Sequence, residues 1–261
     1  MDEFEFIIFA VSIIFAFLFL KEWFGAPYSA WPAERYKLVH QVFGFLPFVS
    51  VLIILYVLKN LASFDVVDDT FYIIFYILLG ITFISFGLKM VTYYFDISWQ
   101  DDAVNLNNKA ALCVILGAFL GLTFIYSGAN IGDGPGWWCV LFAGALGLIT
   151  FLILGFVIAG LLKVSEKITI DRDISTGIRF GFYLCASGII LGKACSGDWT
   201  SFYMTVIEFF RGWPVLYLTI AVAVSENFYK NKKSSNYSYS LILGFLYIAF
   251  SVASLVFLMR F

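Results

Sequence analysis

The amino-acid sequence predicts an all-α membrane protein that crosses the bilayer eight times, and three observations support this fold class. The 261-residue chain is 62% hydrophobic and only 13% charged, with a mean hydropathy of +0.92. A soluble domain carries about 25% charged residues, so this chain has too few polar side chains to shield its apolar ones from water. The apolar residues also form long runs, and the connections between runs alternate between several basic residues and almost none.

Eight runs are long enough to span a bilayer, which takes about 20 mostly apolar residues. The first follows an acidic N-terminus that lacks the basic region and cleavage site of a signal peptide, so we expect it to be retained as a helix. The seventh contains Glu208, Arg211 and Pro214. Either the whole run spans, or residues 199–211 lie along the outer interface and the span begins near Trp213. The expected spans are 4–20, 41–58, 71–94, 110–131, 137–162, 177–194, 203–225 and 237–259.

The basic residues orient these spans, because loops rich in Lys and Arg stay in the cytoplasm. One set of alternate connections holds most of the basic residues, at intervals of about seventy residues. This pattern predicts four tandem helical hairpins, each closed by a cytoplasmic loop, with both termini outside. The rich set is Lys21, Arg35, Lys37, Lys89, Lys109, Lys163, Lys167, Arg172, Arg179, Lys230, Lys232 and Lys233; the poor set is Lys59, Lys193 and Arg260, with Arg211 inside the seventh run.

The chain divides into an N-terminal hairpin (1–70), two related hairpins (71–199) and a C-terminal hairpin (200–261). The two middle hairpins are related because each second helix carries a pair of glycines four residues apart and ends in a Ser-Gly turn with a nearby Asp. Such glycines let helix backbones approach closely, so we expect them to serve helix packing, with an oligomer interface or a pore lining as the alternative. The glycines are Gly117 and Gly121 in one hairpin and Gly188 and Gly192 in the other.

These second helices open on Asn108-Lys109-Ala110-Ala111 and on Asp173-Ile174-Ser175-Thr176-Gly177. Here the chain resembles the small bacterial inner-membrane proteins of the YjfL type, a domain of unknown function. Those proteins are built around two hairpins whose second helices open on a Gly-Asn-x-Ala-Ala-type motif. The resemblance covers roughly residues 71–199, with Asn107 in place of the motif's glycine and Asp173 in place of its asparagine. It implies this architecture and a multi-pass location in the bacterial inner membrane, but no activity.

Four polar residues are candidates for a transport path or pore. Glu208 and Arg211, three residues apart, share a helix face and can pair, and charges kept inside a bilayer are functional candidates. The alternative is an interfacial helix that leaves both charges in water. Asn108 and Asp173 would begin adjacent helices at the cytoplasmic end, either as helix caps or as the lining of a vestibule for ions or a small solute.

The outer turns carry Asp133 and Asp198 among glycines, which indicates either a cation site at an outer mouth or simply tight turns. His40 is the only histidine, and the chain has no CxxC pair, so we expect no metal site. No phosphate-binding loop or catalytic motif is present, and we expect neither an enzyme nor a cofactor. The net charge of −2 argues against a nucleic-acid partner.

The function we expect is a channel or transporter for an ion or a small solute, embedded in the lipid bilayer as a homo-oligomer. Its path would lie near the fourth, sixth and seventh helices. One alternative is a non-transporting anchor or scaffold that recruits a membrane or cytoplasmic protein, for instance in envelope stress or defence. Another is a membrane redox or lipid enzyme with a hydrophobic cofactor.

Overall fold

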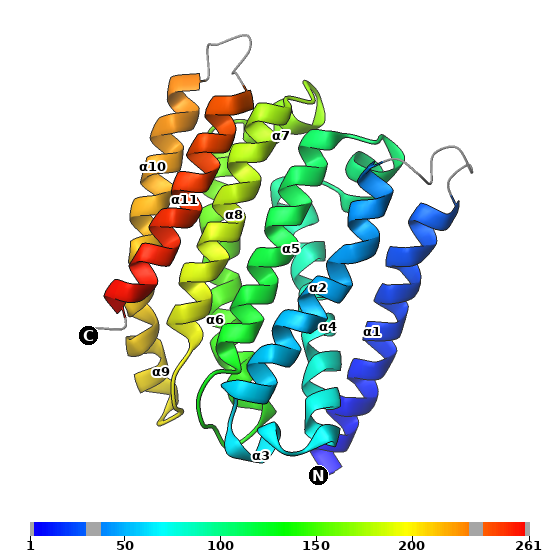
Figure 1. The fold of residues 1–261 in the computed structure, drawn as a ribbon, viewed down its shortest axis with the longest axis vertical. Helices are drawn as coiled ribbons and strands as arrows, with labels where there is room; N and C mark the ends of the chain where they lie inside the picture. Colours follow the sequence, from blue (N-terminus) through cyan, green and yellow to red (C-terminus); the bar gives the residue numbers. More distant parts are fainter. Residues whose placement is uncertain (1–2, 30–37, 230–236, 259–261) are drawn as a thin grey trace.

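The computed structural model describes residues 3–29, 38–229 and 237–258, which fold into a bundle of helices (Figure 1). Within these residues, eight helical segments are long and apolar enough to cross a membrane, which confirms the predicted fold class. They are α1 (Glu3–Ser29), α2 (Leu38–Asn60), α4 (Thr70–Phe95), α5 (Lys109–Ala129), α6 (Trp137–Phe156), α8 (Ile174–Cys195), α9 (Phe202–Phe209) continued by α10 (Pro214–Tyr229), and α11 (Tyr237–Leu258).

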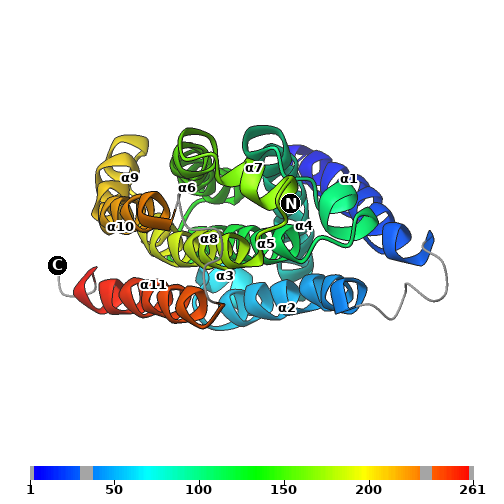
Figure 2. The same ribbon diagram turned by 90° about the horizontal axis from the view of Figure 1, so that it is seen from above.

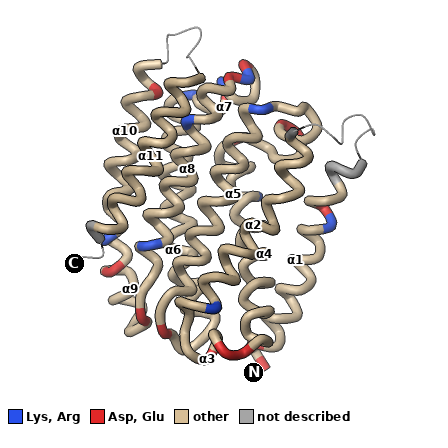
Figure 3. The backbone as a smooth tube through the Cα atoms, in the orientation of Figure 1, with Lys and Arg blue, Asp and Glu red and all other residues tan. Residues whose placement is uncertain are grey.

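Short elements connect the spans: the helices α3 (Phe64–Val67) and α7 (Val164–Thr169), the π-helical turns η1 (Trp99–Asn105) and η2 (Val157–Leu161), and the 3-10 turn η3 (Phe210–Gly212). We call the end of the bundle at which α5 and α8 begin the cap end, and the opposite end, with Gly132 and Gly197, the turn end. Most charged residues lie near these two ends (Figure 3), as expected of a bundle that crosses a bilayer. Several basic residues of the predicted loops lie outside the described residues: Arg35, Lys37, Lys230, Lys232, Lys233 and Arg260.

Helices α5 and α8 lie side by side at the centre, with α2 and α11 along one side of them and α6 on the other (Figure 2). Successive spans run in opposite directions, but the most extensive contact joins α5 to α8, which belong to different hairpins and run parallel. A Cβ atom on Gly117 would overlap the Gly181 carbonyl, and one on Gly128 would overlap the Gly192 carbonyl. Glycine is therefore required for the two backbones to pack directly on each other.

The connections that lead into α5 and α8 each have a left-handed residue at both ends. Asp96 and Asn107, which flank the first connection, have φ angles of 54° and 50°. Lys163 and Arg172, which flank the second, have φ angles of 55° and 51°. Left-handed residues other than glycine are uncommon, so their repetition at matching places supports the predicted relation between the two middle hairpins.

Helix α1 is attached near the cap end through Trp23. This side chain is fully buried, and its Nε1 donates a hydrogen bond to the Phe43 carbonyl of α2 at 2.9 Å. Its ring also packs on Trp99 of η1 and Phe119 of α5, at centroid distances of 4.6 and 5.1 Å. Much of the rest of α1 is exposed and apolar, which suits contact with lipid.

The seventh span is helical from Phe202 to Tyr229 but is interrupted at η3. Pro214 occupies the first turn of α10, where its missing N–H costs no hydrogen bond. Just before it, a Cβ atom on Gly212 would come within 2.7 Å of the Ala194 Cβ atom of α8. The interruption therefore lets the chain approach α8 closely as α10 begins.

Candidate functional site

Asn108 and Asp173 cap the two central helices. Asn108 Oδ1 accepts hydrogen bonds from the N–H groups of Ala110 and Ala111, while its Nδ2 donates to the Ile168 carbonyl at 2.7 Å. Asp173 accepts from the N–H groups of Ser175 and Thr176. Both side chains satisfy N–H groups that a helix start leaves free, and Asn108 also holds α7 against α5.

One turn into α8 lies a buried ion pair. The Arg179 guanidinium contacts the Glu226 carboxylate of α10 through two hydrogen bonds, from Nε to Oε1 and from Nη2 to Oε2, the latter at 2.9 Å. Both side chains are 1% exposed. The two parallel bonds fix the carboxylate in the plane of the guanidinium, which is the strongest geometry for such a pair.

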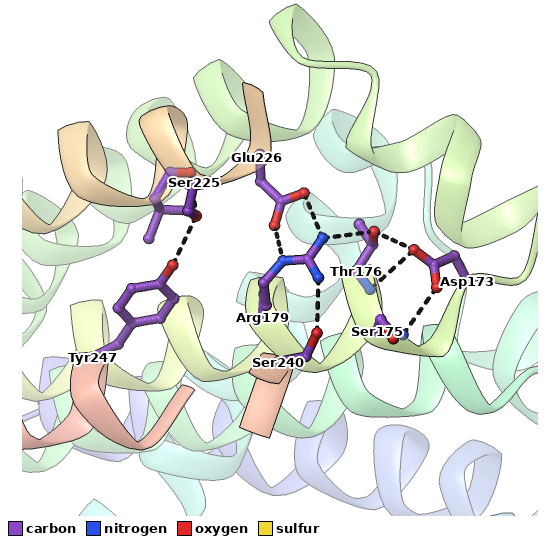
Figure 4. A network of polar contacts seen from close by, with 9 residues as sticks. Asp173, Ser175, Thr176, Arg179, Ser225, Glu226, Ser240 and Tyr247 are labelled. Carbon is purple, nitrogen blue, oxygen red and sulfur yellow. Dashed lines mark hydrogen bonds and ion pairs between the residues drawn. The ribbon is translucent and has the colours of Figure 1, made fainter. Parts of the chain in front are cut away.

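Two hydroxyl groups and an aromatic ring also contact Arg179, and Figure 4 shows the hydroxyl groups, those of Thr176 and Ser240. Nη1 donates to the Ser240 hydroxyl of α11 at 2.8 Å, and Nη2 donates to the Thr176 hydroxyl at 3.1 Å. The Thr176 hydroxyl in turn donates to Asp173 Oδ2. The Tyr229 ring lies 4.7 Å from the guanidinium carbon. Arg179 thus ties α10 and α11 to α8 and is connected to the capping carboxylate through one hydroxyl.

Hydroxyl groups continue along the contact between α8 and α10. One turn beyond Arg179, Tyr183 Oη lies 3.0 Å from Thr219 Oγ1. The Thr219 hydroxyl donates to the Val215 carbonyl, so it accepts the hydrogen bond from Tyr183. Ser187 follows one turn later; it is buried, and its Oγ has no hydrogen-bond partner in the described part of the chain. We call Arg179, Tyr183, Ser187, Thr219 and Glu226 the α8–α10 seam.

At the turn end, a small cavity of about 50 Å³ lies among the two outer turns, α3, α6 and α9. This volume holds a few water molecules, since one needs roughly 10–15 Å³. We call it the turn-end pocket. Asp198 Oδ1 accepts from the Asp133 N–H at 2.9 Å, and the Trp199 N–H donates to the Asp133 carbonyl at 2.7 Å. The acidic residues that line the pocket are Asp65, Asp133, Asp198 and Glu208.

The predicted pair of Glu208 and Arg211 does not form: within the described residues no ion pair joins them. Glu208 is half-buried and lines the turn-end pocket, with Oε2 3.8 Å from the position of a Cβ atom on Gly197. Arg211 is exposed. The interruption at η3 separates the short α9 from α10, so the two residues lie at the edge of the bundle.

The structure instead pairs Arg179 with Glu226, two residues that the sequence analysis did not select. Arg179 was counted among the basic loop residues. Its distance from the capping Asp173 was a usable signal, because it places Arg179 more than one turn inside the helix. Glu226 gave no such signal, because the predicted seventh span ends at 225, whereas α10 extends to Tyr229.

The fold and this site define a multi-pass helical membrane protein with a buried ion pair between its spans. The family model described as Domain of Unknown Function (DUF350) matches residues 56–195, more than half of the chain. The chain therefore belongs to this family, in agreement with the resemblance to YjfL-type proteins. No curated protein and no solved structure matches the chain.

The matched segment contains Arg179 but neither Glu226 nor Ser240. The ion pair thus joins the family domain to the two helices that follow it. Across the described ranges, no group of three or more His, Cys, Asp or Glu residues is placed to hold a metal ion.

Proposed function

We propose that this protein moves an ion or a small solute across the membrane, along the contact between α8 and α10. The observation that carries the proposal is the Arg179–Glu226 pair, which lies fully buried inside two of the spans. Charges are costly inside a bilayer, at least ~2.5–3.5 kcal/mol for one residue at the centre of a span, and a chain that keeps them usually uses them.

Two polar regions on the same helices support the proposal. The α8–α10 seam begins near the cap end, and the turn-end pocket borders the far end of α8 through Ala194, Cys195 and Ser196. Between them, Ala194 and Gly212 pack directly on each other. This arrangement suits a transporter in a closed state, with a polar region near each end and an apolar contact between them.

The cellular setting is part of the proposal. We place the protein in the inner (cytoplasmic) membrane of a bacterium, as a homo-oligomer with the cap end facing the cytoplasm. The supporting observation is the sequence pattern, in which the basic connections lie at the cap end. Among the described residues of this set are Lys21, Lys109, Lys163 and Lys167.

A second candidate function is a scaffold that anchors a partner protein without transport. The direct backbone contact of α5 with α8 favours it, because the centre of the bundle is packed without room for a side chain at Gly117 or Gly128. In this case the Arg179–Glu226 pair would serve only to attach α10 and α11.

Flux measurements on the purified full-length protein in liposomes separate the two candidates. We expect the wild-type protein to pass at least one species from a panel of inorganic ions and small solutes. Glu226→Gln should reduce that flux by about tenfold or more, a rise in the barrier of about 1.4 kcal/mol. Glu208→Gln tests the contribution of the turn-end pocket in the same assay.

The matched control is Glu166→Gln, which makes the same chemical change in an exposed pair, with Lys163 Nζ 3.5 Å from Glu166 Oε1. We expect this variant to keep the wild-type flux. Absence of flux for every species, together with a partner that co-purifies in stoichiometric amount, would support the scaffold and overturn the transport proposal.

A further inference from the structure

We propose that the proton is the ion that this protein binds and moves, or couples to another solute, and that Glu226 is the group that takes it up. The inference rests on the proposed transport function and names its ion. It is carried by the arrangement of charges around Arg179, which lies between two carboxylates. Glu226 contacts the guanidinium directly, and Asp173 reaches it through the Thr176 hydroxyl.

This arrangement lets Glu226 change its charge without leaving a buried charge uncompensated. Breaking a buried ion pair by neutralising one partner is normally strongly destabilising, because the other charge stays buried alone. Here Arg179 keeps its link through Thr176 to Asp173, its hydrogen bond to Ser240 and its contact with the Tyr229 ring. The second carboxylate therefore balances the guanidinium when the first is neutral.

The chemical step is a simple proton transfer. A hydronium ion gives one proton to a carboxylate oxygen of Glu226, so an O–H bond forms and a water molecule is released. The neutral carboxylic acid keeps its carbonyl oxygen, which still accepts a hydrogen bond from Arg179. The ionic attraction between α8 and α10 is lost, and α10 becomes free to move relative to α8. Release of the proton restores the pair.

The titratable groups that face Glu226 come from α8, α10 and α11. From α8 it meets Arg179, with Asp173 behind Thr176, and on α10 Tyr229 lies beside the guanidinium. From α11, Tyr247 bonds to the neighbouring Ser225. The short η2, which also contacts α10, carries no titratable side chain. Glu226 is thus the carboxylate in direct contact with a cation in this cluster.

The lack of space and of oxygen ligands beside Glu226 argues against an ion larger than a proton. The Glu226 and Arg179 side chains are each 1% exposed, so a hydrated metal ion has no room beside them. A metal ion would also need several oxygen ligands and would lie against the positive guanidinium. A proton requires neither space nor a ligand cage.

The rest of the α8–α10 seam offers hydroxyl groups along which a proton can pass. Tyr183 donates to Thr219 one turn beyond the pair. The buried Ser187 oxygen, which lacks a partner among the described residues, needs a hydrogen bond that a water molecule would supply.

Two measurements on the full-length protein in liposomes test the inference. In infrared difference spectra recorded during an acid titration, the protonated-carboxyl band should contain a component that is present in the wild type and lost in Glu226→Gln, beside the bands of the other carboxyl groups. A pH-sensitive dye trapped in the vesicles should report proton uptake that falls about tenfold or more in Glu226→Gln. Glu166→Gln, which neutralises an exposed carboxylate outside the site, should keep both signals.

If Glu226→Gln does not fold, the double variant Arg179→Gln/Glu226→Gln removes both charges together and should lack both signals. A protonated-carboxyl band identical to that of the wild type in either variant would overturn the assignment to Glu226. Flux of another ion or solute that does not depend on a pH gradient would overturn the proton inference while leaving the transport proposal intact. Absence of flux for all species, protons included, would overturn the transport proposal itself.

Discussion

Helices α5 and α8 occupy equivalent places at the centre of the bundle, but they differ in the side chains on corresponding positions. Counted from the capping residue, Ala111, Val114, Ala118 and Leu122 of α5 correspond to Thr176, Arg179, Tyr183 and Ser187 of α8. All eight are buried. The α5 set is entirely apolar, whereas each member of the α8 set carries a polar group.

The difference teaches that α5 and α8 share features of the backbone, whereas their buried side chains at corresponding positions differ in polarity. Caps, left-handed connections and glycine contacts recur in both, because they fix the backbone. The polar side chains occur only where α8 faces α10 and α11, helices that lie beyond the family domain. We therefore expect perturbations of the backbone to affect both copies alike, and perturbations of side chains to affect α8 selectively.

The largest effect should follow Arg179→Gln, which leaves Glu226 and Asp173 without a cation. We expect a loss of about 3–5 kcal/mol in the free energy of unfolding, because a buried carboxylate loses its partner. Glu226→Gln should cost less, since Asp173 still balances Arg179. Thermal unfolding in detergent measures both, and Val114→Gln on α5 is the matched substitution at the corresponding place. Equal losses for Arg179→Gln and Glu226→Gln would contradict the balancing role of Asp173.

Gly117→Leu and Gly181→Leu should each reduce the free energy of unfolding by about 3 kcal/mol, the upper part of the range for overpacked cores. Each new side chain would collide with the backbone of the opposite helix. The control is Gly44→Leu on α2, where a Cβ atom would meet nothing within 4 Å. A large difference in the free energy of unfolding between the Gly117 and Gly181 variants would show that the two helices do not contribute equally to the stability of their contact.

Substitutions at the two helix caps should have an intermediate effect on the free energy of unfolding. Asn108→Ala and Asp173→Ala each remove the side-chain acceptor at a helix start, at a cost of about 1 kcal/mol. Asn108→Ala should cost more, because it also removes the bond to Ile168. Conversely, Asp173→Ala should reduce proton uptake in the dye assay, and Asn108→Ala should not. If proton uptake fell in Asn108→Ala and not in Asp173→Ala, Asp173 would have no part in the site.

The smallest effect on stability should come from Tyr183→Phe, which removes one buried hydrogen bond, worth about 1 kcal/mol. Proton uptake should nevertheless slow, because the proposed route along the α8–α10 seam loses one of its hydroxyl groups. Thr123→Val is the control, since Thr123 of α5 makes a comparable buried hydroxyl contact with Ser50 at 2.7 Å. Unchanged uptake in Tyr183→Phe would exclude the hydroxyl chain as the route.

The eight spans were predictable because the length of an apolar run is a local property. Predicted and observed bounds differ by few residues, as at 137–162 and Trp137–Leu161. The glycine pairs indicated close helix contacts, but Gly181, which meets Gly117, belongs to a further pair with Gly177 that was not selected. Which helix lies against which depends on the packing of the whole bundle.

The site was predicted only in part, for the same reason. Asp173 was selected, because a polar residue before an apolar run is a local signal. Arg179 was counted with the cytoplasmic loop because it lies only two residues inside the predicted sixth span, 177–194, whereas α8 begins at Ile174 and places it five residues inside. Its pairing with Glu226 requires α10 to lie beside α8. The sequence of either helix alone does not show that the two are neighbours. Glu208 and Arg211 had the spacing of a pair, but the helix ends between them.

The hydrogen bonds between the two outer turns have a mechanical consequence. Gly197 N–H donates to the Ile131 carbonyl at 3.0 Å, alongside the bonds that join Asp133 to Asp198 and Trp199. With backbone contact along their length and a lock at one end, α5 and α8 must move as a single rigid body. Any change of shape therefore falls to the helices around them. Of these, the seventh span has a ready hinge in η3, so a swing of α10 would open the bundle at the buried ion pair.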